Sequence, residues 1–180
     1  PLAVTVAPCS RSSRRAIRRI CPMIFLTVGT QLPFTRLTGA ANRIAGENGL
    51  KVFAQTAEPD SNYPHLEHQA FLNPSEYETI LSKARILVGH AGIGTILTAK
   101  KYQLPVILFP RRAELGEHRN DHQLATVTQV KNHTGVFVAH TDQELSELLQ
   151  RKDLVHACEE DNKNHHRLKD FLNDYVTKLP

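Results

Sequence analysis

The apolar positions of the chain form short runs of strand length, separated by segments with helical spacing. Phe34–Glu47 is one such segment, because its apolar residues repeat along one face of a helix. Strands that alternate with helices build βαβ units, and these units form parallel sheets. The alternation therefore predicts an α/β fold, a Rossmann-like parallel sheet flanked by helices. The runs that predict strands are Ile24–Val28, Lys51–Thr56, Gln69–Leu72, Arg85–Val88, Pro105–Phe109 and Gly135–Ala139.

Capping residues mark the ends of several predicted helices. Asn48–Gly49 ends the first helix, since a glycine or asparagine readily takes the left-handed C-terminal position. Asn73 or Ser75 caps a helix from about Pro74 to Lys83. Thr141 and Glu144 have the spacing of a capping box. Two more helices are expected, one from Gln123 to about Asn132 and one in the tail after residue 151, with the apolar stripe Leu168, Phe171, Leu172 and Tyr175.

A glycine-rich turn, Gly89–Gly94, joins the strand Arg85–Val88 to a helix predicted over Thr95–Gln103. Glycines let a backbone approach a ligand closely, and the free N–H groups and dipole of a helix start attract a phosphate. Thr95 would add a hydroxyl contact or cap the helix. The turn lacks the lysine of a P-loop and the spacing of a dinucleotide fingerprint. It predicts a phosphate site without specifying ATP or NAD, and close helix packing is the alternative explanation.

Two further loops follow strands of the same predicted sheet. Arg111–His122 is highly charged and comes directly after an apolar strand, and Gly29–Thr30–Gln31 follows the first strand. Loops at the carboxyl ends of parallel strands form the ligand crevice of α/β sheets. The three loops together therefore predict one functional rim. The alternatives are a solvated helix start for the charged loop and a plain turn for the glycine loop.

At these loops the sequence resembles a known family. The segments HAGIGT, LPVILFP and ELGEHRNDHQLAT are similar to the carboxyl-terminal domain of family 28 glycosyltransferases, which have the GT-B fold. The resemblance runs from about Met23 to about Leu149. It is most like small catalytic subunits of two-part transferases, which act on dolichol-linked sugar in eukaryotes or make bacterial exopolysaccharide and capsule. PRRAELGEHRNDHQLAT looks most like the exopolysaccharide group.

The resemblance implies a donor site on the predicted rim. The glycine turn would hold the diphosphate, His122 and Gln123 the sugar hydroxyls, and Glu114 or Glu117 the sugar or ribose. The sequence departs from many relatives at Thr98, where they carry a ribose-binding glutamate. The donor-binding residues expected from the resemblance are Gly29, Thr30, His90, Ala91, Gly92, Gly94, Thr95, Arg111, Arg112, Glu114, Glu117, Asn120, His122 and Gln123.

The catalytic base is not fixed by the sequence, and His90 and Glu114 are the candidates by residue type. Arg111 and Arg112 would pair with the carboxylate of a glucuronate donor or with the diphosphate, unless they are surface charge. His118 and His122 have the i, i+4 spacing of zinc ligands on one helix face. Because no HEXXH pattern and no third ligand accompany them, no metal and no other cofactor is expected.

Charge and cysteine content narrow the class of protein. The net charge is +4, but the five arginines of residues 1–22 account for it, since the rest carries 17 basic and 18 acidic residues. A body with no net basic charge predicts no nucleic-acid partner. Three cysteines without CxxC spacing fit a reducing compartment. Residues 1–22 are expected to be a basic extension, either not native, lipid-contacting or a transit peptide, before one domain over 23–180.

The expected function is inverting transfer of a hexose from a UDP-sugar to a lipid-linked saccharide in exopolysaccharide or capsule synthesis. The hexose would be glucuronate, galactose, glucose or N-acetylglucosamine. A GT-B site lies between two domains, so a membrane-anchored partner subunit would supply the acceptor half. This places the protein in the cytoplasm, at the inner face of the membrane. The alternatives are a non-catalytic nucleotide-sugar-binding protein and an epimerase-like domain.

Overall fold

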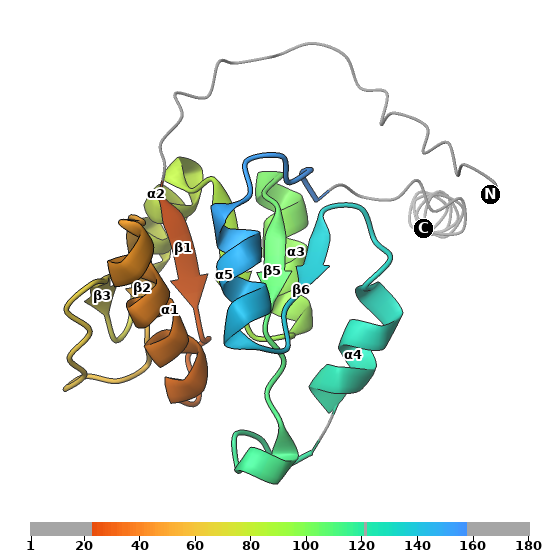
Figure 1. The fold of residues 1–180 in the computed structure, drawn as a ribbon, viewed down its shortest axis with the longest axis horizontal. Coiled ribbons are helices and arrows are strands. Elements are labelled where there is room, and N and C mark those ends of the chain that lie inside the picture. The colour runs from red at the N-terminus through yellow and green to blue at the C-terminus, as the bar shows by residue number, and fades with distance from the viewer. Residues whose placement is uncertain (1–22, 121, 158–180) are drawn as a thin grey trace, which may run out of the picture.

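The computed structural model describes residues 23–120 and 122–157, and these form a parallel sheet flanked by helices (Figure 1). The sheet has six strands in the order β3-β2-β1-β4-β5-β6, and every neighbouring pair is parallel. This confirms the predicted Rossmann-like fold. The strands are β1 (Ile24–Thr27), β2 (Val52–Gln55), β3 (Glu67–Gln69), β4 (Ile86–Gly89), β5 (Val106–Leu108) and β6 (Val136–Val138).

Helices cover both faces of the sheet. Successive residues of β1 point to opposite faces, so Leu26 belongs to one core cluster and Phe25 to the other. The first cluster packs under α1 (Thr35–Asn48) and α5 (Asp142–Gln150), which lie in front of the sheet in Figure 1. The second packs under the helices of the other face, α2 (Pro74–Lys83), α3 (Ile93–Tyr102) and α4 (His122–Val130).

Two of the predicted caps are present and a third is modified. Gly49 ends α1 with φ of 61°, in the left-handed conformation that favours glycine. Asn73 forms a complete capping box with Glu76 at the start of α2. Thr141 accepts from the N–H of Glu144, as predicted, but the Glu144 carboxylate turns to the N–H of His140. The Glu144 carboxylate therefore accepts from the residue before the N-cap, whereas in a capping box it accepts from the N–H of the N-cap itself.

Three predicted element bounds need correction. β3 is Glu67–Gln69, not Gln69–Leu72, because this short polar edge strand aligns its backbone with Phe53–Gln55 and has no apolar face to mark it. α3 begins at Ile93 with Gly92 as its N-cap, so Thr95 lies inside the helix and is not its cap. α4 starts at His122 and ends at Val130, two residues before the predicted end.

Because all six strands are parallel, their carboxyl ends lie at one edge of the sheet, and the loops predicted to form the rim meet there. At the opposite, amino edge the chain returns after α5, where the N–H of Ala157 donates to the carbonyl of Leu104 at 3.2 Å. Residues 1–22 and the predicted stripe Leu168, Phe171, Leu172 and Tyr175 lie outside the described residues. Within the described part of the chain, every helix is too short or too polar to cross a membrane.

Candidate functional site

Two open cavities lie at the carboxyl edge of the sheet and share Gly29 and Thr30. We call the smaller one, of about 290 Å³, the loop cavity; it is lined by Val28, Gly29, Thr30, Gln31, Leu32, His90, Arg111, His118 and Gln123. We call the larger one, of about 410 Å³, the helix cavity; it is lined by Thr27, Gly29, Thr30, Gln55, Leu72, Pro74, Tyr77, Glu78, Thr98, Lys101 and Tyr102.

In the sequence, the start of α3 is flanked by residues that line the two cavities. His90, just before the helix, lines the loop cavity, and Thr98, in its second turn, lines the helix cavity. The N-cap Gly92 offers no side chain, and no described residue accepts a hydrogen bond from the N–H of Ile93 or Gly94. Unpaired N–H groups at the positive end of a helix bind anions.

Gly94 leaves this helix start open to a ligand. A Cβ added at Gly94 would meet no atom within 4 Å, so the space beside its backbone is empty. Thr95 occupies the inner side of the same turn, where its side chain is buried and packs against Gly89. Gly94 thus fits the predicted diphosphate contact, whereas Thr95 is placed to support the turn from within, and its predicted hydroxyl contact stays untested.

The imidazole of His90 lies against two glycines. A Cβ on Gly92 would come within 2.5 Å of His90 Nε2, and one on Gly29 would come within 3.1 Å of Cε1. Burial, together with the nearby charges of Arg111 and His118, lowers the pKa of His90 to about 4. His90 Nδ1 is buried and has no hydrogen-bond partner among the described residues. The loop cavity therefore presents a neutral imidazole at physiological pH.

The depressed pKa of His90 predicts a loss of stability in mild acid. Because the unfolded chain binds a proton near pH 6.5 and the folded chain only near pH 4, stability falls as the pH drops through this window. For this partly buried ring we expect a loss of about 1–2 kcal/mol between pH 7 and pH 4. Urea unfolding across that range should show a smaller loss in His90→Gln than in the wild type. His65→Gln, at an exposed histidine, is the control and should behave as the wild type.

Arg111 joins the two loops that form the walls of the loop cavity. It is only 3% exposed, and its guanidinium stacks on the Phe34 ring with a separation of 4.4 Å. Its nitrogens donate to four backbone carbonyls, those of Val28, Leu32, Pro33 and Glu117, over distances of 2.6 to 3.3 Å. The predicted contact of Arg111 with a donor would require some of these bonds to break, and it stays a prediction.

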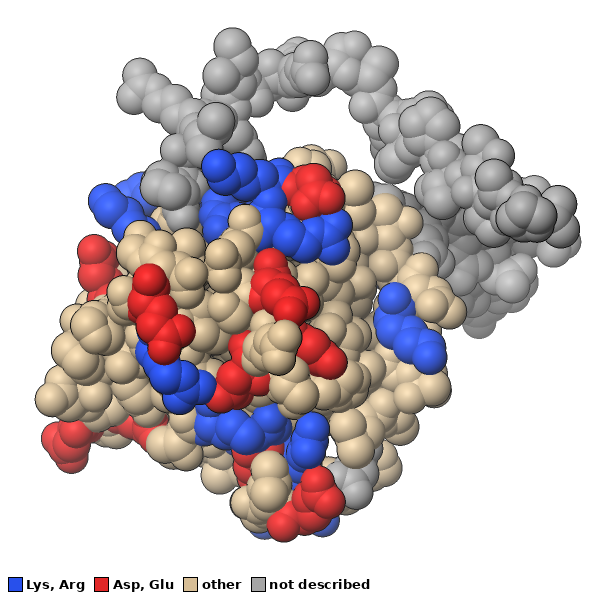
Figure 2. Space-filling view, viewed as in Figure 1, with Lys and Arg blue, Asp and Glu red and all other residues tan. Residues whose placement is uncertain are grey.

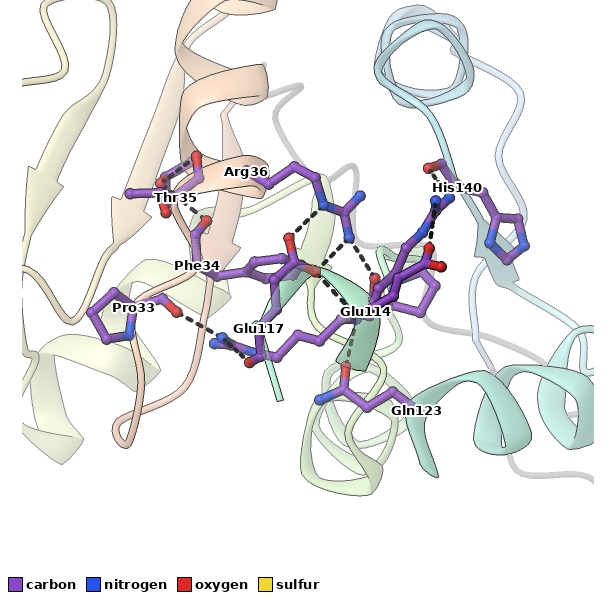
Figure 3. Close-up of polar contacts among 12 residues, drawn as sticks. Pro33, Phe34, Thr35, Arg36, Glu114, Glu117, Gln123 and His140 are labelled. Atoms are coloured by element: carbon purple, nitrogen blue, oxygen red, sulfur yellow. Dashed lines mark hydrogen bonds and ion pairs between the residues drawn. The ribbon is translucent and has the colours of Figure 1, made fainter. Parts of the chain in front are cut away.

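Arg36 and Glu117 form a second link between the same loops. Arg36 on α1 donates to both carboxylate oxygens of Glu117, at 2.6 and 2.8 Å, and to the Pro110 carbonyl at 2.8 Å (Figure 3). Burial alone would raise the pKa of Glu117, but hydrogen bonds from Arg36 and the Arg112 N–H lower it below its ordinary value. The carboxylate is therefore engaged within the protein, and its predicted sugar or ribose contact remains untested.

Gln123 connects the glycine turn to the charged loop. Its Oε1 accepts from the N–H of Ala91 at 3.2 Å and from the N–H of Arg111 at 3.0 Å. The side chain is 8% exposed and lines the loop cavity, and its Nε2 has no partner among the described residues. Gln123 thus keeps an amide donor for the predicted contact with a sugar hydroxyl.

Nine of the fourteen predicted donor residues line neither cavity: Ala91, Gly92, Gly94, Thr95, Arg112, Glu114, Glu117, Asn120 and His122. Arg112 donates to the His140 carbonyl and lies 3.5 Å from the carboxylate of Glu114, which is 72% exposed. Asn120 and His122 are exposed, and the side-chain oxygen of Asn120 accepts from the N–H of His122. The interpretation of His118 and His122 as one helix face is wrong, because α4 begins only at His122. No three potential metal ligands come together among the described residues.

Most of the helix cavity was not predicted from the sequence. Its lining residues come from the ends of β1 and β2 and from α2 and α3, which are distant in the sequence. Tyr77 is one of them; burial raises its pKa, and hydrogen bonds with Thr98 and Thr27 partly offset this. The one sequence signal was Thr98, which the family resemblance places at a ribose-binding position. The cavity combines aromatic, hydroxyl and charged groups, as small-molecule sites do.

The sequence matches the glycosyltransferase family 28 C-terminal domain over residues 23–175. A comparison with curated proteins finds no match. Similar solved structures are found, among them MurG of Acinetobacter baumannii, with a TM-score of 0.55 and 16% identity over 74% of this chain. A UDP-glucose: anthocyanidin 3-O-glucosyltransferase in complex with UDP has a TM-score of 0.53 and 16% identity over 86% of this chain.

The length of these structures differs from that of the chain. The chain spans 43% of the MurG chain and 36% of the glucosyltransferase chain. It spans 94% of ALG13, whose solution structure matches with a TM-score of 0.52 and 14% identity over 81% of this chain. At these identities the likeness shows the fold, which is that of the carboxyl-terminal half of a GT-B glycosyltransferase.

Proposed function

Because the chain belongs to the family defined by the glycosyltransferase family 28 C-terminal domain, we propose that it is the donor-binding half of a glycosyltransferase that uses a UDP-sugar. The observation that carries this proposal is the open N-terminus of α3, which has no side-chain cap and empty space beside Gly94. The unpaired N–H groups of Ile93 and Gly94 would hold the diphosphate there. The choice of UDP is supported by the similar anthocyanidin 3-O-glucosyltransferase, whose crystal structure is a complex with UDP.

In this proposal each cavity binds a different part of the donor. The helix cavity has aromatic and apolar walls from Tyr77, Tyr102 and Leu72, which suit the nucleoside. The loop cavity has polar groups, the His90 ring and the Nε2 of Gln123, which suit a hexose. Gly29 and Thr30, which line both cavities, then lie beside the diphosphate that joins the two parts.

This arrangement performs two of the three tasks of glycosyl transfer. The helix start stabilises the negative charge that develops on the leaving diphosphate, and the loop cavity orients the sugar. The third task is removal of a proton from the acceptor. Of the two predicted bases, His90 lines the loop cavity, whereas Glu114 lies outside both cavities. We therefore keep His90 as the candidate base, and the proposed reaction uses no metal.

We also propose that a second subunit completes the site. The described residues include six large apolar side chains that are strongly exposed, and five of them follow the carboxyl ends of strands. Large apolar side chains left exposed on these loops and on α3 support an interaction surface. A membrane-anchored partner seated there would bring a lipid-linked acceptor to the sugar, at the inner face of the membrane. The five residues are Leu32, Phe71, Ile93, Leu97 and Leu115.

The finer specificity rests on the resemblance alone. The segment Pro110–Thr126 supports a role in exopolysaccharide or capsule synthesis with glucuronate, galactose, glucose or N-acetylglucosamine as the hexose. Within that choice, Arg111 gives little support to glucuronate, since its guanidinium is occupied by carbonyls. The surface in Figure 2 carries both signs of charge, with acidic side chains over α5 between basic groups, which fits the proposed absence of a nucleic-acid partner.

Gly94→Ala tests the diphosphate site directly. A methyl group at residue 94 meets no protein atom but fills the space that a phosphate would use. We expect Gly94→Ala to fold normally, to be slightly more stable because alanine favours a helix, and to bind UDP at least about tenfold more weakly by calorimetry. Gly39→Ala on α1 is the matched control, since its Cβ also meets nothing within 4 Å, and it should bind UDP as the wild type does.

Equal UDP affinity in Gly94→Ala and the wild type would contradict the proposed diphosphate position. Equal weakening in Gly94→Ala and Gly39→Ala would show an effect on the fold and not on the site. Binding of UDP-sugars without transfer, in the presence of the membrane subunit, would favour the non-catalytic alternative.

A further inference from the structure

The helix cavity contains a carboxylate that the proposed function has not used. Glu78 on α2 lines this cavity together with Thr98 and Lys101 of α3, which face it from the other helix. Of the carboxylates in the described residues, Glu78 alone lines either cavity. Glu117 is bound by Arg36, and Glu114 lies beside Arg112 outside both cavities.

The present partner of Glu78 is easily displaced. Its Oε1 lies 3.6 Å from the Nζ of Lys101, and both side chains are largely exposed, at 63% and 70%. An exposed ion pair at this separation contributes little, because water and salt screen it. The carboxylate is therefore available to a ligand that enters the cavity, with no tightly held partner to lose.

A pair of neighbouring hydroxyl groups is the chemistry that best fits these side chains. A carboxylate offers two acceptor oxygens to two hydroxyl donors, and such bonds to a charged acceptor are stronger than neutral ones. Acidic residues bind ribose hydroxyls in this way in other nucleotide-binding α/β folds. Thr98 adds a hydroxyl from α3 that lines the same cavity and is hydrogen-bonded to Tyr77.

We infer that Glu78, assisted by Thr98, binds the 2′ and 3′ hydroxyls of the donor ribose. This inference rests on the proposed function, since it takes the helix cavity as the nucleoside site. It assigns the ribose contact to α2, whereas many relatives carry a ribose-binding glutamate at the position of Thr98, and Glu114 or Glu117 were the expected replacements for it here. The consequence is that the protein distinguishes ribonucleotides from deoxyribonucleotides through Glu78.

The test compares UDP with 2′-deoxy-UDP and 3′-deoxy-UDP by calorimetry on the full chain. We expect the wild type to bind UDP about tenfold more tightly than either deoxy analogue, the factor of one hydrogen bond to a charged group. Glu78→Ala should reduce this preference to about twofold or less, and Thr98→Val should reduce it in part. Because Glu78 is exposed, its replacement leaves the folded core intact.

Glu47→Ala is the matched control. Glu47 is an exposed glutamate on α1 that lines neither cavity, so its loss changes the net charge equally and should leave the preference at the wild-type value. If the wild type binds UDP and Glu78→Ala keeps the full preference, this inference is overturned while the proposed function stands. If the folded wild type binds no uridine nucleotide, the proposed function itself fails, and the inference fails with it.

Discussion

Replacing Arg111 by alanine is expected to lower the free energy of unfolding by about 3–5 kcal/mol, since it leaves several buried carbonyls without a donor. The guanidinium supplies hydrogen bonds to four backbone carbonyls and stacks on Phe34. No neighbouring group can replace so many donors at once. Urea unfolding monitored by circular dichroism would measure the loss.

Two variants make this expectation specific. Arg112→Ala removes the adjacent arginine, which is about one third exposed and donates to one carbonyl, and should cost less than about 1 kcal/mol. Arg111→Lys keeps the charge but not the planar fork, so it should rescue only part of the stability. If Arg111→Ala and Arg112→Ala proved equally mild, the carbonyls would not depend on Arg111, and its role as a link between loops would be refuted.

Replacing Glu117 by alanine is expected to cost about 2–4 kcal/mol, because Arg36 and the Arg112 N–H then lose their acceptor. The side chains of Arg36 and Glu117 are only 24% and 12% exposed, so water restores little of the lost interaction. We expect the same variant to bind UDP normally but to lose any affinity gained from the sugar part of a UDP-sugar. The effect is limited to the sugar because the neighbours of Glu117, His118 and Arg111, line the loop cavity and not the helix cavity.

A double-mutant cycle measures the coupling free energy between Arg36 and Glu117. If the ion pair is responsible, Arg36→Ala should cost much less in the Glu117→Ala protein than in the wild type, with a coupling of about 1.5–3 kcal/mol. Glu114→Ala is the control, since that carboxylate is 72% exposed and its loss should change stability by less than about 0.5 kcal/mol. Additive losses for Arg36 and Glu117 would mean that the observed contact contributes nothing.

The fold was largely predictable because local patterns and tertiary packing agree. The runs Ile24–Val28 and Arg85–Val88 are mainly apolar, as expected of central parallel strands covered on both faces, and they contain most of β1 and β4. β3 was misplaced because Glu67–Gln69 lies at the edge of the sheet with little of it buried. An edge strand paired on one side only needs no apolar pattern, so the sequence contains no signal for its position.

The sequence predicted which loops lie at the candidate site, but not which residues form hydrogen bonds with one another there. Arg111 and Glu117 were assigned to the donor from the family resemblance and from their place in a charged loop on the predicted rim. Their partners, Pro33 and Arg36, lie 78 and 81 residues away, and no local pattern shows that such residues will meet. The helix cavity was not predicted for the same reason. Its residues Gln55, Tyr77 and Thr98 come from separate elements, and no local pattern shows that they meet. Gly92 and Gly94 could be named from the sequence because the phosphate contact predicted for them depends only on the turn that contains them.

The long-range links of Arg111 also bear on how the protein folds and unfolds. The bonds from Arg111 to Val28 and Leu32 span 83 and 79 residues, so they can form only after β1, β4 and β5 have assembled. Contacts that form after the folding transition state leave the folding rate almost unchanged and slow unfolding instead. We therefore expect the hydrogen bonds of Arg111 to slow unfolding of the loop cavity without speeding its folding.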